Sequence, residues 1–182
     1  MSRGPRTFHL LFLGDKDVGI TSLIEHTPID YAGEGDWGLG IEFYQQNVRL
    51  QEGPARLVMF ELGREDSFAT VARNFKRDCG VILVYDVTRP TTLANVLDTF
   101  SRLKPHLPEV IPRILVANKA DLEDSREVDT PAGFAAASAI DAEYLETSVV
   151  DKDRENIQLV LTDIAEAIAH VDFDEGDSQD LE

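Results

Sequence analysis

Residues 8–22 read FHLLFLGDKDVGITS, and this stretch decides the fold. A mostly apolar run at residues 8–13, with His9 as its one polar residue, ends at Gly14, and a second glycine, Gly19, follows five residues later. A short apolar run bounded by glycine is typical of a strand buried on both faces. A buried strand, a glycine turn and a helix together form the first half of a βαβ unit. The stretch therefore predicts an α/β domain built on a largely parallel sheet.

The same alternation of apolar runs and helix-period segments continues along the chain. Further strands are predicted at residues 41–50, 55–61, 80–86, 113–118 and 142–147. Helices are predicted at residues 93–103, 130–140 and 157–168, the second with Thr130 as its cap and Pro131 in its first turn. The fold class is thus α/β, with a six-stranded mixed, mostly parallel sheet and helices on both faces. Its one hairpin is expected to place an antiparallel strand at an edge.

The chain has 182 residues, with 17 Lys and Arg against 34 Asp and Glu, which gives a formal net charge of −17. This length suits one domain with a sizeable core. The acidic balance argues against nucleic-acid binding and against adhesion to anionic membranes, because both need a basic surface. The single cysteine, Cys79, excludes an internal disulfide framework and indicates a reducing compartment. We expect Cys79 itself to lie in the core.

Three segments are predicted: an amino-terminal extension at 1–6, one globular domain at 7–171 and a solvated tail at 172–182 that carries six acids and no base. A signal peptide is not expected, because no long apolar stretch follows the basic start. Ser2 and the absence of a terminal cysteine remove the common lipid-anchor signals. We therefore expect a cytoplasmic protein without a direct membrane anchor.

The turn after the first strand matches most of a phosphate-binding loop. The motif G-x-x-x-x-G-K-[ST] is met at Gly14, Gly19 and Thr21, but its lysine is replaced by Ile20. The glycines let backbone N–H groups face a phosphate, and the Thr21 hydroxyl is a candidate Mg²⁺ ligand. The predicted phosphate-binding set is Gly14, Asp17, Val18, Gly19, Ile20, Thr21 and Ser22. The alternative is a plain glycine turn from strand to helix.

A second motif follows the strand predicted at residues 113–118. Asn118-Lys119-Ala120-Asp121 suits guanine: Asp121 accepts two hydrogen bonds from the base, Asn118 supports the loop and bonds the base edge, and the Lys119 stem lies over the ring. Ligands of doubly wound domains bind at this carboxyl edge of the sheet. The alternative is that these are ordinary polar turn residues.

Together these motifs make the chain resemble a small GTPase of the Ras superfamily, most similar to the Rab branch. Residues 80–88, which read GVILVYDVT, resemble a strand segment of that branch, and Glu146-Thr147-Ser148 resembles its second base-binding loop. The resemblance covers about residues 7–171. It implies GTP or GDP as ligand with Mg²⁺, and it adds Ser148 and the backbone of Val149 to the guanine-binding set.

The resemblance is incomplete on the phosphate side. Besides Ile20, Gly38 stands where the family has a metal-binding threonine, the segment at residues 61–63 is one residue short, and Arg64 replaces the glutamine that orients the attacking water. These departures imply impaired GTP hydrolysis, so no catalytic residue is assigned. Lys16 either supplies charge to the phosphates or is a solvated surface lysine, and Arg64 as an internal finger is a similar alternative.

Three interpretations remain open at this point. The chain is a regulator that binds GTP or GDP with little turnover, a nucleotide-free scaffold, or a GTPase that uses Lys16 or Arg64 unconventionally. In each case the family implies protein partners at the segments 33–43 and 63–76. Trp37, in the first of these, is either an exposed partner anchor or folds into the phosphate region. By analogy with unprenylated Rab-like proteins, recruitment to a trafficking membrane or a ciliary assembly by partners is expected.

Overall fold

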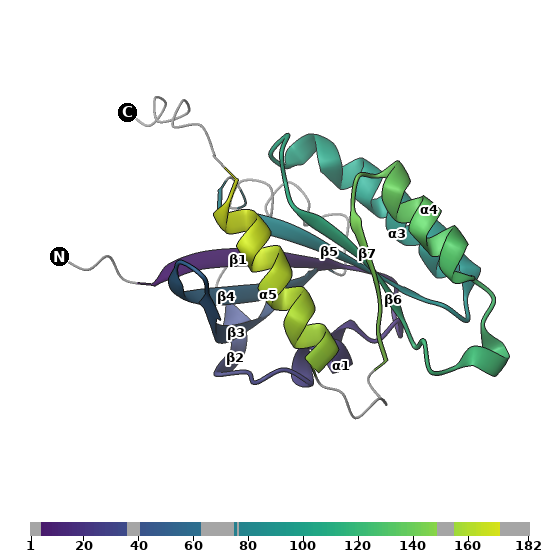
Figure 1. The fold of residues 1–182 in the computed structure, drawn as a ribbon, viewed down its shortest axis with the longest axis horizontal. Helices are drawn as coiled ribbons and strands as arrows, with labels where there is room; N and C mark the ends of the chain where they lie inside the picture. Colours follow the sequence, from purple (N-terminus) through teal and green to yellow (C-terminus); the bar gives the residue numbers. More distant parts are fainter. Residues whose placement is uncertain (1–4, 36–40, 63–74, 76, 149–154, 172–182) are drawn as a thin grey trace.

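The computed structural model describes residues 5–35, 41–62, 75, 77–148 and 155–171. They form a seven-stranded sheet in the order β2-β3-β4-β1-β5-β6-β7 (Figure 1). The strands are β1 (Arg6–Leu13), β2 (Tyr31–Gly35), β3 (Ile41–Leu50), β4 (Gly53–Leu62), β5 (Cys79–Asp86), β6 (Arg113–Asn118) and β7 (Glu143–Glu146). All six predicted strands are present, and β2 is an addition.

The sheet is mixed and mostly parallel, as predicted. Strand β1 pairs in parallel with both β4 and β5, and β5-β6 and β6-β7 are parallel as well. The antiparallel strand β3 pairs with β4 on one side and with β2 on the other. The prediction that the hairpin strand forms an edge was therefore wrong. The short β2 segment has no strand-like apolar alternation, and it becomes a strand by hydrogen bonding to β3.

Helices cover both faces of the sheet (Figure 1). They are α1 (Ile20–Glu25), α3 (Pro90–Leu103), α4 (Thr130–Ala139) and α5 (Glu155–Ala169), with short 3-10 turns η2 (Lys104–His106) and η3 (Glu123–Ser125). Apolar residues of α1 and α5 share one buried cluster, and those of α3 and α4 share the other.

The cap of α4 differs from the prediction by one residue. Asp129 is the N-cap, and its side chain accepts a hydrogen bond from the backbone N–H of Ala132 at 2.8 Å. The hydroxyl of Thr130 instead donates to Glu146 Oε1 at 2.7 Å. Asp and Thr are both good N-caps, so the sequence alone did not separate them, and the contact to β7 decides which residue serves.

Strand β5 is buried along its whole length, which fits a central parallel strand. Its first residue, Cys79, is fully buried, as predicted, and burial raises the pKa of its thiol to about 12. Gly80 lets α5 approach closely, because a Cβ at this position would lie 2.9 Å from Ile164 Cδ1. Among the helices that the structure describes, none is long and apolar enough to cross a membrane.

Candidate functional site

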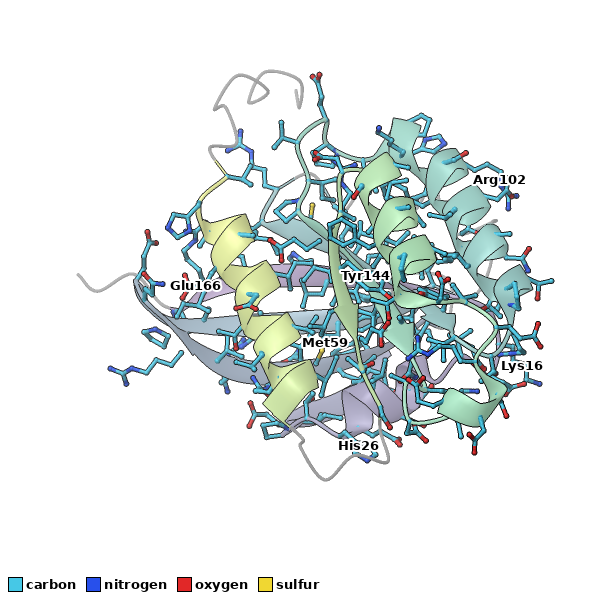
Figure 2. All side chains as sticks on the ribbon, turned by 45° about the vertical axis from the view of Figure 1, so that its right-hand side comes forward. Lys16, His26, Met59, Arg102, Tyr144 and Glu166 are labelled. Carbon is cyan, nitrogen blue, oxygen red and sulfur yellow. The ribbon has the colours of Figure 1, made fainter. Side chains whose placement is uncertain are left out.

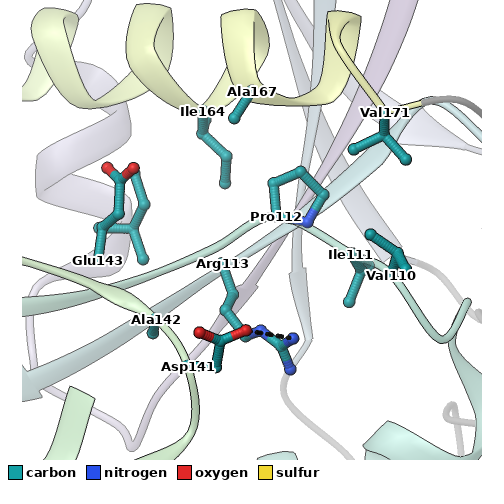
Figure 3. Close-up of a pocket in the computed structure, with 11 residues that line it drawn as sticks. Val110, Ile111, Pro112, Arg113, Asp141, Ala142, Glu143, Ile164, Ala167 and Val171 are labelled. Atoms are coloured by element: carbon teal, nitrogen blue, oxygen red, sulfur yellow. Dashed lines mark ion pairs between the residues drawn. The ribbon is translucent and has the colours of Figure 1, made fainter. Parts of the chain in front are cut away.

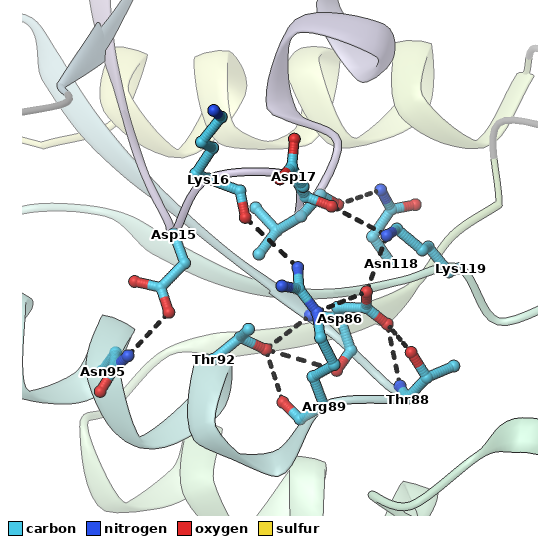
Figure 4. A network of polar contacts seen from close by, with 11 residues as sticks. Asp15, Lys16, Asp17, Asp86, Thr88, Arg89, Thr92, Asn95, Asn118 and Lys119 are labelled. Carbon is cyan, nitrogen blue, oxygen red and sulfur yellow. Dashed lines mark hydrogen bonds and ion pairs between the residues drawn. The ribbon is translucent and has the colours of Figure 1, made fainter.

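The two sequence motifs meet at the carboxyl edge of the sheet. Strands β1, β5 and β6 are parallel neighbours, so the residues that follow Leu13, Asp86 and Asn118 emerge at the same edge. Figure 4 shows Asp15, Lys16 and Asp17 of the glycine loop beside Asp86, Asn118 and Lys119. This is the edge at which doubly wound domains bind ligands.

The glycine loop has the backbone that its sequence requires. Gly19 has φ 99°, in the left-handed region, and a Cβ there would lie 2.6 Å from Asn118 Nδ2. A Cβ on Gly14 would lie 2.7 Å from the carbonyl oxygen of Val84. Asp17 also adopts a left-handed conformation, with φ 64°. Such alternating loop conformations direct backbone N–H groups into a concave surface that suits an anion.

Ile20, at the lysine position of the motif, lies in the core. Its side chain is only 3% exposed, and its Cδ1 lies 3.1 Å from the point that a Cβ on Gly14 would occupy. It packs in the same cluster as Val18 and Ile24. The residue that would place an ammonium group on the phosphates therefore contributes apolar packing beneath the loop instead.

Lys16 does not take over that role in this structure. Its side chain is exposed at the edge of the molecule (Figure 2), and in Figure 4 it extends away from Asp86 and Lys119. Its backbone carbonyl, in contrast, faces that cluster. This geometry favours the solvated surface lysine over the phosphate-binding one.

Asn118 and Lys119 bind the glycine loop directly. Asn118 Nδ2 donates to the carbonyl oxygen of Val18 at 2.8 Å, and Lys119 Nζ donates to that of Asp17 at 2.8 Å. Asn118 is fully buried, and its Oδ1 accepts a hydrogen bond from the hydroxyl of Thr147 at 3.2 Å. These two side chains thus join the base motif to the glycine loop through contacts within the protein itself.

Asp121 and Ser148 form the outer part of the predicted base site. Ser148 Oγ donates a hydrogen bond to Asp121 Oδ1, and Asp121 is exposed. The loops that carry them are also joined by the backbone, since the N–H of Ala120 donates to the carbonyl of Thr147 at 3.0 Å. A carboxylate held in this way at the sheet edge presents acceptor oxygens to solvent, where two N–H groups of a base can bind.

Asp86, at the end of β5, is a central residue of the site that the sequence analysis did not select. Its side chain is 2% exposed, and it forms an ion pair with Lys119 Nζ at 2.7 Å. Its Oδ1 accepts hydrogen bonds from the N–H and the hydroxyl of Thr88, at 2.9 and 2.6 Å. Burial by itself would raise the pKa of Asp86, but the bonds from Lys119 and Thr88 lower it to about 2. A lone acid directly after an apolar strand was the signal that could have revealed it.

The predicted magnesium ligand Thr21 lies beside a carboxylate. Its hydroxyl donates to Glu61 Oε2 at 3.0 Å, which joins the first turn of α1 to the end of β4. Hydroxyl and carboxylate oxygens are the ligands that Mg²⁺ prefers, so the pair fits this ion. Ser22, next to Thr21, is exposed on α1.

Several predicted residues fall outside the described part of the chain. Arg64, Trp37, Gly38, Val149 and most of the segment 63–76 belong to this group, as do residues 36–40 of the segment 33–43. The statements about them remain predictions.

A pocket of about 440 Å³ lies at the opposite end of β6 (Figure 3). Arg113, Asp141 and Ile164 are among its lining residues, and Arg113 Nη2 lies 3.7 Å from Asp141 Oδ2. None of the predicted nucleotide-site residues that the structure describes lines it. It is therefore separate from the site described above.

A glycine loop between β1 and α1 and a base motif after β6 define a small GTPase-like nucleotide-binding domain. Residues 9–170 match the model of the Ras family, and the chain belongs to this family. Among similar proteins are Ras-related protein RABE1e of Arabidopsis thaliana, Ras-related protein RIC1 of Oryza sativa subsp. japonica and GTP-binding protein ypt2 of Schizosaccharomyces pombe.

The similarity to these proteins extends over most of both chains. RABE1e is 30% identical over 87% of this chain and 73% of its own length. RIC1 is 31% identical over 83% and 75%, and ypt2 is 30% identical over 76% and 70%. The predicted resemblance to the Rab branch is confirmed. The chain is a Rab-like member of the superfamily of small GTP-binding proteins.

Proposed function

We propose that this chain is an atypical Rab-like protein that binds GTP or GDP, hydrolyses GTP poorly or not at all, and acts as a regulatory or assembly module. The observation that carries guanine binding is the exposed Asp121 carboxylate, held by Ser148 at the carboxyl edge of the sheet. Asn118 and Lys119 already hold the glycine loop, so packing explains their presence. Among the described residues Asp121 makes no such contact with the loop, and binding of a guanine base would explain why a carboxylate stands there.

Weak or absent hydrolysis is supported by the phosphate side of the site. Losing the lysine replaced by Ile20 removes a charge-assisted hydrogen bond, worth about 1.5–3 kcal/mol or roughly ten- to a hundredfold in affinity. Hydrolysis depends almost wholly on positioning and on charge stabilisation at the phosphates, so it suffers more than binding. Under this proposal the nucleotide is held chiefly by its base and by backbone N–H groups.

The output of the module is contact with protein partners through the segments 33–43 and 63–76. Residues 7–171 form the binding domain and residues 172–182 an acidic tail. Recruitment by such partners to a membrane or ciliary assembly is part of the proposal. A partner-binding role needs no turnover, which suits the departures at Ile20 and Arg64.

A nucleotide-free scaffold is the second candidate, and one observation favours it. Asn118 and Lys119 donate hydrogen bonds to two carbonyls of the glycine loop, those of Val18 and Asp17. The protein's own side chains thus hold the loop in place, as a scaffold would require.

One experiment separates the two candidates. Purified protein is denatured, any released nucleotide is identified by chromatography, and the protein is titrated with labelled GDP and GTP with and without Mg²⁺. The proposal expects binding with little phosphate release. No released nucleotide and no binding up to millimolar concentration would leave the scaffold.

A base-specific variant tests the assignment of Asp121. In Asp121→Asn the amide offers a donor where the carboxylate offered an acceptor, so guanosine nucleotides should bind more weakly and xanthosine nucleotides more tightly. Asp124→Asn, an exposed position in η3, is the matched control and should change neither. If the Asp121→Asn protein binds GDP with the same affinity as the unmodified protein, base recognition at this residue is contradicted.

A further inference from the structure

We infer that Asp86 and Arg89 are positioning residues that hold the backbone of the glycine loop in a phosphate-ready shape before a ligand arrives. Arg89 belongs to neither sequence motif. The inference rests on the proposed function for its consequence, the binding of a nucleotide phosphate chain, but the loop contacts themselves are independent of it.

Three successive carbonyls of the loop are bound by side chains from outside it (Figure 4). Arg89 Nη2 donates to the carbonyl of Lys16 at 3.3 Å. The next two carbonyls, those of Asp17 and Val18, accept from Lys119 and Asn118 as described above. Asn118 and Lys119 of the base motif thus bind two loop carbonyls, and Arg89 binds a third.

Asp86 is the anchor for both cations. Its Oδ2 lies 2.7 Å from Lys119 Nζ and 3.1 Å from Arg89 Nε. The carboxylate is 2% exposed, whereas the side chains of Arg89 and Lys119 are 41% and 29% exposed. One buried anion thus fixes two cations that reach outward to the loop. The backbone N–H of Asp86 donates to Thr92 Oγ1 at 3.0 Å, which ties this anchor to the first turn of α3.

Helix α3 holds the loop at a second point. Asn95 Nδ2 donates to Asp15 Oδ2 at 2.7 Å, one residue before the carbonyl that Arg89 binds. The side chain of Asp15 is thereby directed to α3. Two adjacent loop residues are attached to the same helix, one through its side chain and one through its backbone.

Binding the carbonyls orients the N–H groups. In a trans peptide the C=O and the following N–H point in opposite directions, and the described chain contains no cis peptide. The carbonyls of Lys16 and Val18 are held toward Arg89 and Asn118, so the N–H groups of Asp17 and Gly19 face away from these side chains. Among the described residues neither N–H has an acceptor, whereas that of Val18 donates to the Asp15 carbonyl at 3.4 Å.

This arrangement compensates in part for Ile20. Without an ammonium group at that position, the loop binds phosphate through its backbone N–H groups, and a loop that is already ordered loses less conformational entropy on binding. Arg89 and Lys119 carry two positive charges against the one negative charge of Asp86. The loop itself adds two acids, Asp15 and Asp17, against Lys16, so the compensation rests on the oriented N–H groups and not on net charge. The affinity for a phosphate chain is thus expected to depend on Arg89, although Arg89 need not contact the phosphates.

The test compares Arg89→Ala with Arg102→Ala in the nucleotide-free protein. Arg102 lies near the end of α3, the helix that Arg89 precedes as N-cap, has a similar side-chain exposure of 42% and forms an ion pair with Asp98 of the same helix. Backbone ¹⁵N order parameters of residues 15–18 measure directly how rigid the loop backbone is. They should fall from about 0.85 toward 0.6 in Arg89→Ala and stay unchanged in Arg102→Ala. Unchanged order parameters in Arg89→Ala, at an unaltered unfolding midpoint, would overturn the inference.

Arg89→Lys separates geometry from charge. Arg89 uses Nε for Asp86 and Nη2 for the Lys16 carbonyl, and one ammonium group cannot take both places. The order parameters in Arg89→Lys should therefore stay closer to those of Arg89→Ala than to those of the unmodified protein. If the order parameters in Arg89→Lys equal those of the unmodified protein, a positive charge alone suffices. That result would overturn the role of Arg89 as a bridge between Asp86 and the Lys16 carbonyl.

GDP titration adds the functional consequence. In Arg89→Ala the affinity should fall about tenfold, the lower limit for a hydrogen bond that involves a charged group. If the unmodified protein binds no GDP, the proposed function fails, and the order parameters still decide the inference. If GDP binds equally to both proteins while the loop is looser, the phosphate-ready role is wrong.

Discussion

Asn118 donates a hydrogen bond to the carbonyl of Val18 at 2.8 Å, although the two residues are 100 positions apart in the sequence. The contact makes the base motif and the glycine loop one structural unit. It also changes the meaning of the motif, because a fully buried Asn118 that satisfies a loop carbonyl stabilises the fold whether or not a base is bound. An intact Asn-Lys-x-Asp sequence is therefore evidence of guanine binding chiefly through its last residue, Asp121.

The first prediction follows from that division of roles. Asn118→Ala leaves the Val18 carbonyl and the Thr147 hydroxyl without their partner and should lower the free energy of unfolding of nucleotide-free protein by about 1–3 kcal/mol. Asp121→Ala changes an exposed side chain and should stay within about 0.5 kcal/mol. Urea unfolding measures both. Equal destabilisation by the two variants would contradict the structural role of Asn118.

The second prediction concerns the replaced lysine. Ile20→Lys should tighten GDP binding about tenfold or more, because the lysine stem can follow the apolar path of Ile20 and place its ammonium group at the loop. The same variant should be less stable without nucleotide, since it brings a charge next to a buried site. Fluorescent GDP titration and thermal unfolding give the two readouts.

The control for this variant is Ser138→Lys, which adds the same charge at an exposed position of α4. It separates a specific contact from the general effect of one more positive charge on an acidic protein. If Ser138→Lys tightens GDP binding as much as Ile20→Lys does, the assigned loop geometry is wrong.

The third prediction concerns acid. The pKa of Asp86 is lowered from 3.8 to about 2, so its carboxylate is charged in the folded protein at a pH where the unfolded chain binds the proton. Its stabilising contribution is fully present above about pH 4 and is lost as the pH falls through about 2. In Asp86→Asn this contribution is absent throughout, so the gap in unfolding free energy between the two proteins should narrow as the pH falls below 4.

A carboxyl ¹³C titration by NMR measures the same property directly. The resonance of Asp86 should move with a midpoint near 2. A midpoint of Asp86 near 3.8 would show that Lys119 and Thr88 do not hold the carboxylate as described.

The fourth prediction tests the pair of Thr21 and Glu61. If their oxygens hold Mg²⁺ beside the phosphates, Glu61→Gln should reduce the gain in GDP affinity that Mg²⁺ produces. Without Mg²⁺ the variant should bind GDP at least as well as the unmodified protein, because a negative charge near the phosphates has been removed. Glu52→Gln, in the turn between β3 and β4, is the control. An unchanged Mg²⁺ effect in Glu61→Gln would place the ion elsewhere.

The sequence by itself determined most of the framework. Short apolar runs and a turn-like break at residues 51–54 located six strands, because a strand buried on both faces needs such a run. The glycine loop between the first strand and its helix is likewise a local feature. The selection of Gly14, Gly19 and Asn118 as candidate site residues also followed from motif spacing. The loss at Ile20 was equally visible, since it is one letter in a short motif.

Tertiary structure decided what these residues contact. The seventh strand β2 exists through its pairing with β3, and the cap of α4 is Asp129 because Thr130 bonds Glu146 across to β7. The link from Arg89 to the glycine loop spans 73 residues, and that from Lys119 spans 102. Such contacts depend on the register of β1, β5 and β6, which places the ends of three strands at one edge. No local pattern encodes that register, so the contacts of Asp86 with Lys119 and Arg89 became visible only in the fold.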